Sequence, residues 1–258
     1  MQHALEVGNP GRRKVMPTPL LDVAILSIYQ LDGKYVMLPR RMARATPDMR
    51  AAIMALSAAL AARGGQLRLS DLFRSYEMQL QSHLDWKTGR KSAFSPPPGG
   101  SMHEAGRALD LDLESLGMRL ADFWSIARQH GCVPIISQPD SRANEAWHFD
   151  CRGSHDLVYQ YYKQGKGNNF EKPYQAMAAS AIVAIGVKVD RFKENQTAAA
   201  IQSALIRLGH DIGNLDGDIG RRTEAGLRQA NVPLADEQSM LTALEAQLQA
   251  RFPGEFSL

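Results

Sequence analysis

The sequence lacks the many cysteines and the long hydrophobic run that are typical of small disulfide-bonded extracellular proteins and of membrane proteins, respectively. Its 258 residues include only two cysteines, Cys132 and Cys151, which excludes a disulfide framework. No run of about 18 apolar residues occurs, so we expect no transmembrane helix. Hydrophobic residues make up 44% of the chain and charged residues 22%, which is enough apolar material for one good core and a smaller second one.

Dense charge of one sign is also missing. The net charge is only +3, and the basic excess is confined to residues 1–190, because residues 191–258 carry 7 Lys/Arg and 9 Asp/Glu. Nucleic-acid binding usually requires denser basic clusters, so no nucleic-acid partner is expected. A mildly basic first part suits an anionic polymer instead.

A clear export signal is absent from the N-terminus. The basic residues Arg12–Lys14 precede the apolar stretch Leu20–Leu26, but Pro17, Pro19 and Asp22 interrupt the apolar region. No small-residue cleavage site follows it. We therefore expect a loose N-terminal arm followed by the first core strand.

The hydrophobic period alternates along the first part of the chain. It predicts strands near 20–29, 35–38, 67–73 and 108–113 and helices near 47–63, 77–86 and 120–131. Two further strands, 131–138 and 145–151, flank a turn-rich segment and predict a hairpin that places Cys132 opposite Cys151. Either a cross-strand disulfide or two buried free thiols would fit that register. The pattern as a whole predicts an α+β fold, a small antiparallel sheet with flanking helices.

The composition changes after Tyr161, which predicts a second domain. Residues 163–173 contain Lys-Gln-Gly-Lys-Gly-Asn-Asn and form the expected linker. We predict a catalytic domain over 1–165, including the N-terminal arm, and a helical domain over 166–258. The helices expected in the second domain lie near 174–185, 195–208, 221–230 and 235–251.

Two short segments hold residues of the type that bind a catalytic metal. His103 and Asp110 belong to the first segment and His148 to the second, and two imidazoles with one carboxylate can hold Zn²⁺ with one position open. Gly106 permits the turn that would bring the first two together. Glu145 lies three residues before a ligand and could act as general base on the water that the metal activates. No H-E-x-x-H sequence occurs, so thermolysin-type chemistry on a helix is not predicted.

The same segments resemble a known family. Ser-x-His-x-x-Gly-x-Ala-x-Asp at 101–110, followed 35 residues later by Glu-x-Trp-His at 145–148, is similar to the zinc D-Ala-D-Ala peptidases of peptidase family M15. That family includes the VanY-like D,D-carboxypeptidases and several phage endolysins. Phe-Arg-Ser-Tyr-Glu-Met-Gln at 73–79 looks like the family's Tyr-Arg-Ser-x-x-x-Gln segment, with Phe in place of the first Tyr. The resemblance covers roughly residues 35–162.

The resemblance implies a role for each matched residue. It implies zinc as the cofactor and a small antiparallel sheet of the hedgehog/D,D-peptidase type as the fold. The implied zinc ligands are His103, Asp110 and His148; the implied catalytic residues are Glu145 as base and Arg74 as the group that stabilises charge on the attacked carbonyl; and the implied substrate contacts are Ser101, Gln79 and Trp147. Asp112 or Asp150 is the candidate to hydrogen-bond a ligand imidazole.

The C-terminal part resembles the small three-helix peptidoglycan-binding domain of wall hydrolases. The matched features are Ile-Gln-x-x-Leu-x-x-Leu-Gly at 201–209, Asp-Gly-x-x-Gly at 216–220 and Thr223 at a helix start. Ala230-Asn231 stands where the family usually has Phe-Gln, a departure that bears on sugar binding and not on the fold. A helical domain kept for stability or dimerisation is the alternative.

The expected function is zinc-dependent hydrolysis of D-Ala-D-Ala or crosslink bonds in peptidoglycan, with stem peptides and glycan as partners. The alternatives are an L-Ala-D-Glu endopeptidase of the endolysin or secreted-effector type, a catalytically dead wall-binding protein, and a hedgehog-like signalling domain. The substrate places the protein in the periplasm or the extracellular wall, reached by a phage lysis system, a secretion system or a leader absent from this sequence. No pattern sets the oligomeric state, and a monomer is the default expectation.

Overall fold

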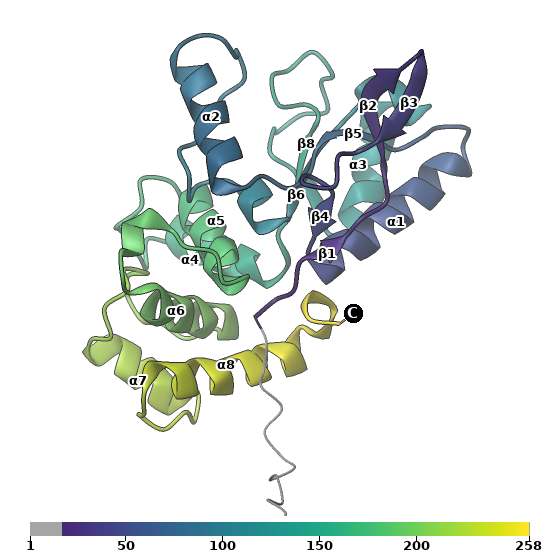
Figure 1. Cartoon of the computed structure of the whole chain (residues 1–258). Coiled ribbons are helices and arrows are strands. Elements are labelled where there is room, and N and C mark those ends of the chain that lie inside the picture. The colour runs from purple at the N-terminus through teal and green to yellow at the C-terminus, as the bar shows by residue number, and fades with distance from the viewer. Residues whose placement is uncertain (1–16, 258) are drawn as a thin grey trace, which may run out of the picture.

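A computed structural model describes residues 17–257 as a strand-rich part and a helical part packed together (Figure 1). The predicted basic arm at Arg12–Lys14 lies outside the described residues. The strands are β1 (Leu21–Asp22), β2 (Leu26–Leu31), β3 (Lys34–Met37), β4 (Arg44–Ala45), β5 (Arg68–Asp71), β6 (Ala108–Leu111), β7 (Cys132–Pro134) and β8 (His148–Cys151). The helices are α1 (Pro47–Ala61), α2 (Tyr76–Lys87), α3 (Leu120–Gln129), α4 (Asp156–Lys163), α5 (Pro173–Ala184), α6 (Gln196–Leu208), α7 (Arg221–Gln229) and α8 (Glu237–Arg251).

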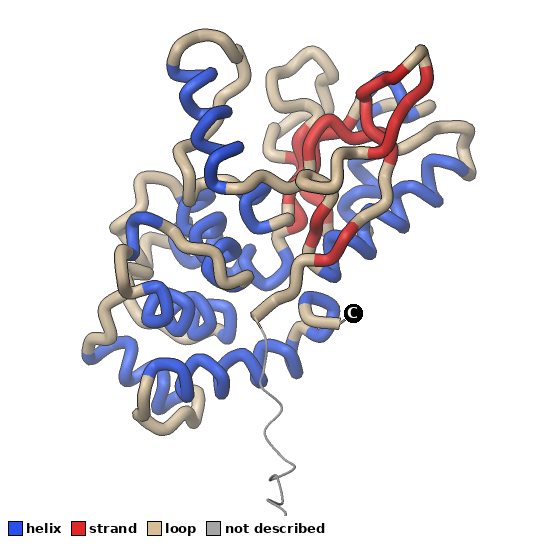
Figure 2. The backbone as a smooth tube through the Cα atoms, viewed as in Figure 1, coloured by secondary structure: helices blue, strands red, loops and turns tan. Residues whose placement is uncertain are grey.

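The α+β class predicted from the sequence is confirmed. The main sheet has the order β3-β2-β5-β6-β8-β7, and its strands gather in one part of the molecule (Figure 2). One pair departs from the antiparallel prediction, since β2 and β5 run parallel. The chain returns from the β2–β3 hairpin to β5 through α1, and a helical crossover of this kind brings the second strand in parallel.

The sheet packs on α1 and α3, which lie together beside it in Figure 1. Met49, Ile53, Leu56 and Leu60 of α1 are buried, at the helical spacing that the sequence showed. They join Leu69 of β5 and other side chains of the sheet in one apolar cluster. This core supports β6 and β8, the inner strands that carry the predicted metal ligands Asp110 and His148.

The predicted cysteine register is confirmed, although the hairpin around it is shorter than expected. Cys132 pairs with Cys151 across β7 and β8, and both are buried free thiols. The ladder ends where Pro134 pairs with Phe149, because proline has no N–H with which to continue it. Glu145, predicted to start the second strand, therefore lies in the connecting loop.

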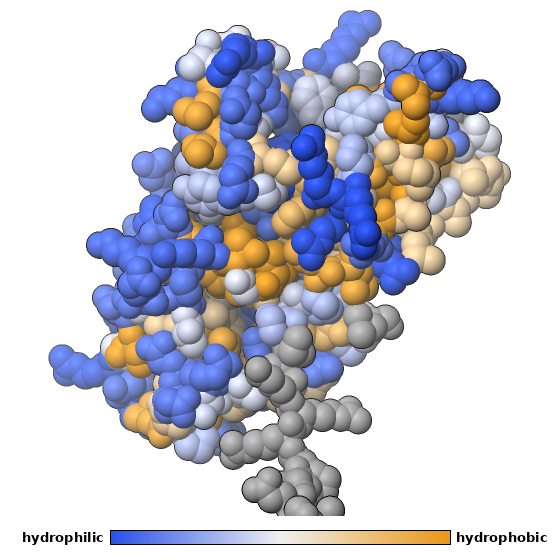
Figure 3. Space-filling view, viewed as in Figure 1, coloured by the Kyte–Doolittle hydropathy of each residue, from blue (hydrophilic) through white to orange (hydrophobic). Residues whose placement is uncertain are grey.

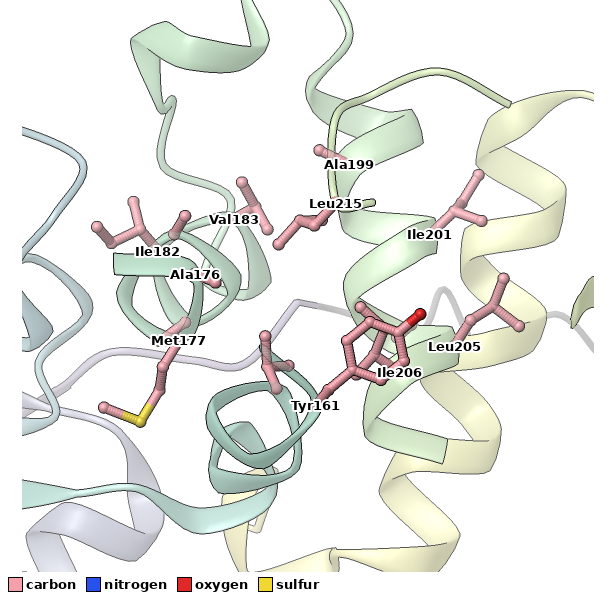
Figure 4. Packing of buried hydrophobic residues seen from close by; sticks show 14 of the residues in the cluster. Tyr161, Ala176, Met177, Ile182, Val183, Ala199, Ile201, Leu205, Ile206 and Leu215 are labelled. Carbon is pink, nitrogen blue, oxygen red and sulfur yellow. The ribbon is translucent and has the colours of Figure 1, made fainter. Parts of the chain in front are cut away.

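A second apolar cluster is built from α4, α5, α6 and α8 (Figure 4). It takes in Met102, Ala105 and Ala108, which come from the segment that carries His103 and from β6. The helical part therefore packs directly behind the predicted metal ligands. The domain boundary near residue 165 stays a prediction. None of the helices between residues 17 and 257 combines the length and the apolar character that a membrane span requires.

A buried group of charges also joins the two parts. Glu255, in a short 3-10 helix after α8, lies 2.8 Å from Arg207 of α6 and 3.4 Å from Arg107, which immediately precedes β6. Arg107 is fully buried and pairs with Asp48 of α1 at 2.8 Å. The Ser154 hydroxyl donates to Glu255 at 2.9 Å. One carboxylate near the C-terminus thus neutralises part of the charge of two buried guanidinium groups.

We expect Glu255→Ala to lower the free energy of unfolding by about 3–5 kcal/mol, because it leaves two buried cations short of a partner. Urea unfolding followed by circular dichroism would measure this loss. Glu171→Ala, which removes an exposed glutamate, is the matched control and should change stability by less than about 0.5 kcal/mol. Equal losses in both variants would contradict the assignment.

Candidate active site

Backbone geometry brings the two predicted ligand segments together. Ser101 caps a short 3-10 helix, Met102–Ala105, whose second residue is His103. Gly106 ends that helix with φ 64°, where a Cβ would come within 2.6 Å of Leu20. The chain then enters β6, and antiparallel pairing with β8 places Asp110 directly opposite His148.

The three predicted ligands form one cluster. Asp110 Oδ1 lies 3.3 Å from His103 Nε2 and 2.8 Å from His148 Nδ1. The donor atoms of all three residues lie within 4.8 Å of one another, and no other group of this kind is found among residues 17–257. Residues 38 positions apart thus converge on one point at the middle of the sheet.

The outer ring nitrogens of the two histidines are held by acceptors. His103 Nδ1 donates to the Leu72 carbonyl at 2.8 Å, and His148 Nε2 donates to Asp150 Oδ1 at 3.0 Å. In the neutral imidazoles that a metal requires, each inner nitrogen would then carry a lone pair on the side of Asp110. His103 Nε2 is buried and has no hydrogen-bond partner, which is the condition of a donor atom that fits a metal. Two imidazoles and a carboxylate are a donor set suited to Zn²⁺.

The electrostatics of the cluster favour a cation among these groups. Burial opposes charge on Asp110, but His103 and His148 hold the pKa of its carboxyl well below the ordinary range. Burial likewise opposes charge on His148, and the carboxylates of Asp110 and Asp150 outweigh it, raising its pKa to about 10. A divalent metal would meet the same attraction.

Of the two aspartates that the sequence offered as partners of a ligand imidazole, Asp150 holds that position and Asp112 does not. Asp112 instead pairs with Arg68 at 2.8 Å. We expect Asp150→Asn to weaken zinc binding by about 10–100-fold, because the amide raises the basicity of His148 less than a carboxylate does. Competition with a chromophoric chelator measures this affinity. Asp112→Asn is the control and should leave it unchanged; an equal effect of both substitutions would contradict the placement.

Glu145 lies in the loop before β8, beside the cluster. Its φ of 68° is in the left-handed region, which non-glycine residues rarely adopt and which recurs at functional sites. Its Oε1 is buried without a hydrogen-bond partner, and its backbone carbonyl accepts from the His148 N–H at 3.0 Å. Burial raises the pKa of this carboxyl, the neighbouring His148 opposes the shift, and Asp110 adds to it. A partly desolvated carboxyl with a free oxygen is suited to taking up a proton.

Arg74 contacts the cluster through Asp110. Its Nε donates to Asp71 at 2.6 Å and one Nη to Asp110 at 3.3 Å, while the other Nη donates to Gln79 at 3.2 Å. Burial disfavours its charge, but Asp71 and Asp110 raise its pKa, so the guanidinium stays charged. Two carboxylates balance it before any substrate is present.

These side chains border one cleft of about 580 Å³. Of the predicted residues, the ones that line it are Arg74, Ser101, His103, Asp110, Glu145, Trp147 and His148. Gln79 is fully buried behind Arg74, where its amide donates to Ser95 and to the Pro96 carbonyl, so it is not brought into the cleft wall. Figure 3 shows hydrophobic side chains gathered across the middle of one face, below α2.

Several lining residues were not anticipated. Lys91, in the polar loop after α2, and Arg152, which follows β8, both line the cleft. Tyr174, Met177 and Ala178 come from α5. No local sequence signal marked them, because each reaches the cleft through tertiary packing.

Comparison with known proteins yields weak structural likenesses, among them the following two. No protein-family model matches the sequence, and no curated protein matches it. The LdcB LD-carboxypeptidase, solved in a study of peptidoglycan recognition, is 18% identical with a TM-score of 0.39, over 52% of this chain and 68% of that one. A Zn(II)-bound mutant of the vancomycin-resistance D,D-pentapeptidase VanY is also 18% identical, with a TM-score of 0.34, over 56% of this chain and 86% of that one. Likenesses of this strength assign no family, and the function proposed below rests on the site residues.

Proposed function

We propose that this protein is a zinc peptidase that hydrolyses peptide bonds of bacterial peptidoglycan. The observation that carries the proposal is the cluster of His103, Asp110 and His148, with donor atoms within 4.8 Å and Glu145 lining the same cleft. The buried Nε2 of His103, which has no hydrogen-bond partner, supports metal binding. The motif order of the sequence supports peptidoglycan as the substrate.

The residues of the cleft divide the reaction between them. When bound by the three ligands, zinc supplies a Lewis acid that acidifies a water molecule and polarises the attacked carbonyl. Glu145 takes the proton of the attacking water on its carboxylate and returns it to the leaving amine. Arg74 donates hydrogen bonds to the oxygen on which charge develops. Asp71 holds the Arg74 guanidinium in place for this task.

We further propose that Ser101 and Trp147, which border the cleft, contact the peptide. Gln79 does not contact the peptide in this proposal. Its side-chain oxygen accepts a hydrogen bond from Arg74 and so helps to position that guanidinium. The helical region 166–258 is proposed to bind the wall. Its position behind the cleft supports binding near the scissile bond.

Mass analysis of a defined pentapeptide stem after incubation with the zinc-loaded protein tests this proposal. Loss of one terminal D-alanine would identify a D,D-carboxypeptidase, and a cut between the first two residues would identify an L-Ala-D-Glu endopeptidase. An intact stem peptide, together with intact crosslinked wall fragments, would overturn the proposed function.

A further inference from the structure

The end of the cleft formed by α4 and α5 contains a guanidinium without a role in the chemistry above. Arg152 directly follows β8, four residues after His148, and lines the cleft. The strand that delivers a metal ligand therefore also fixes the position of this cation.

Arg152 is held firmly but is incompletely satisfied. One Nη pairs with Asp156 at 3.1 Å, and the guanidinium lies 4.7 Å from the centre of the Tyr159 ring. Its Nε is buried and has no hydrogen-bond partner. Asp156 is its only ionic partner among the described residues, and the side chain of Asp156 is 40% exposed. A buried N–H without an acceptor favours a ligand that brings one.

The other cations of the cleft lining are Arg74 and Lys91, and Lys91 donates to the Ser82 hydroxyl at 3.1 Å. Arg74 is bound by Asp71 and Asp110, and Asp150, near Arg152 in sequence, is engaged by His148 at 3.0 Å. Arg152 has one ionic partner in the described part of the chain, Asp156, and an Nε without an acceptor, so it can bind an anion supplied by the substrate. Its planar fork of donors matches a carboxylate in particular.

The surrounding wall fits an anionic group carried on an aliphatic backbone. Tyr159 of α4 and Tyr174 of α5 are half-buried and border the same cleft, where each phenol can donate a hydrogen bond. Met177 gives this end an apolar floor, and Figure 4 shows its side chain pointing away from Ile201 and Leu205 of α6. The helical part thereby contributes directly to substrate contact.

We propose that Arg152, with Tyr159 and Tyr174, forms a subsite that binds a free carboxylate of the substrate. The proposal rests on the proposed peptidase function and names the group that orients the peptide. Two sources share this chemistry: the terminal carboxylate of a peptide, and the carboxylate of an acidic residue within it.

Binding to the zinc-loaded Glu145→Gln protein, measured by calorimetry, tests the subsite without turnover. Two pairs of stem peptides distinguish the sources, one pair with a free or amidated C-terminus and one with a free or amidated internal acidic residue. In one pair the free acid should bind at least about tenfold tighter than its amide. Adding Arg152→Gln should weaken binding of that acid by about 10–100-fold, the value of a charged hydrogen bond, and leave its amide unchanged.

Arg152→Lys should retain part of the preference, and Arg142→Gln, an exposed arginine on a loop of the same part of the chain, should retain all of it. The lysine variant also covers the case in which Arg152→Gln does not fold. Equal binding of acid and amide in both pairs, or equal weakening of acid and amide by Arg152→Gln, would overturn the subsite. Cleavage of stem peptides by the unaltered protein is scored separately, so the subsite and the peptidase function can fail independently.

Discussion

Replacing Glu145 with glutamine is expected to lower kcat by about 10²–10⁴-fold, the usual contribution of a positioned general acid–base group. Glutamine keeps the shape of the side chain but cannot accept the proton of the attacking water. Glu145 is not one of the three clustered donors, so bound zinc should remain at its original stoichiometry. Steady-state cleavage of a stem peptide and metal analysis of the same sample measure both quantities.

Asp140→Asn is the matched control for this substitution, because Asp140 is an exposed carboxylate on the same loop. It should leave kcat within about twofold, as expected for a surface change that touches no functional group. If Glu145→Gln retained full turnover, another base would have to exist. If it lost zinc together with activity, Glu145 would act on the metal site and not on the proton.

The second large effect is expected from His148→Ala. The substitution removes one of three donors and leaves Asp110 without its 2.8 Å partner. Loss of a residue that only hydrogen-bonds a metal ligand lowers metal affinity by up to about 100-fold. Loss of the ligand itself should lower zinc affinity by more than this, and hydrolysis should fall to background. Equilibrium dialysis with metal analysis measures the affinity. Thermal unfolding with and without added zinc should show that the variant has lost the stabilisation that ligand binding gives the folded state.

His130→Ala serves as control, because His130 is exposed at the end of α3 and outside the cluster. It should bind zinc as the unaltered protein does. Unchanged zinc affinity in His148→Ala would contradict the assigned ligand set. A loss in His130→Ala as large as that in His148→Ala would point to general destabilisation instead.

Local patterns predicted much of this arrangement. Apolar spacing located α1. The cysteine register followed from counting residues away from a turn. These features depend on residues close in sequence, so the sequence alone was sufficient for them.

Long-range pairing was the harder part. The parallel neighbour of β2 depends on where the chain returns after α1, and the position of Glu145 depends on where a ladder ends. The sequence could not separate Asp112 from Asp150 as partner of a histidine, since both lie on β-type segments near a ligand. Pairing of β6 with β8 decided that question, and it left Asp112 free for Arg68.

The substrate-facing side of the cleft was least visible from the sequence. Tyr174 and Met177 lie in a stretch that composition assigned to a separate helical domain, yet α5 packs behind His103 and borders the cleft. Gln79 was expected to contact substrate and instead supports Arg74 from behind. Side-chain direction at these positions depends on helix packing that no local motif encodes.

The most direct test of zinc-dependent hydrolysis is a zinc titration of the chelated protein, with hydrolysis of a stem peptide followed at each step. Activity should disappear on chelation and return in proportion to bound zinc. It should reach its full value at one zinc per chain, as expected for the single cluster of His103, Asp110 and His148 found among residues 17–257. Hydrolysis that persists in the metal-free protein, or activity that does not follow zinc occupancy, would contradict a zinc-dependent mechanism.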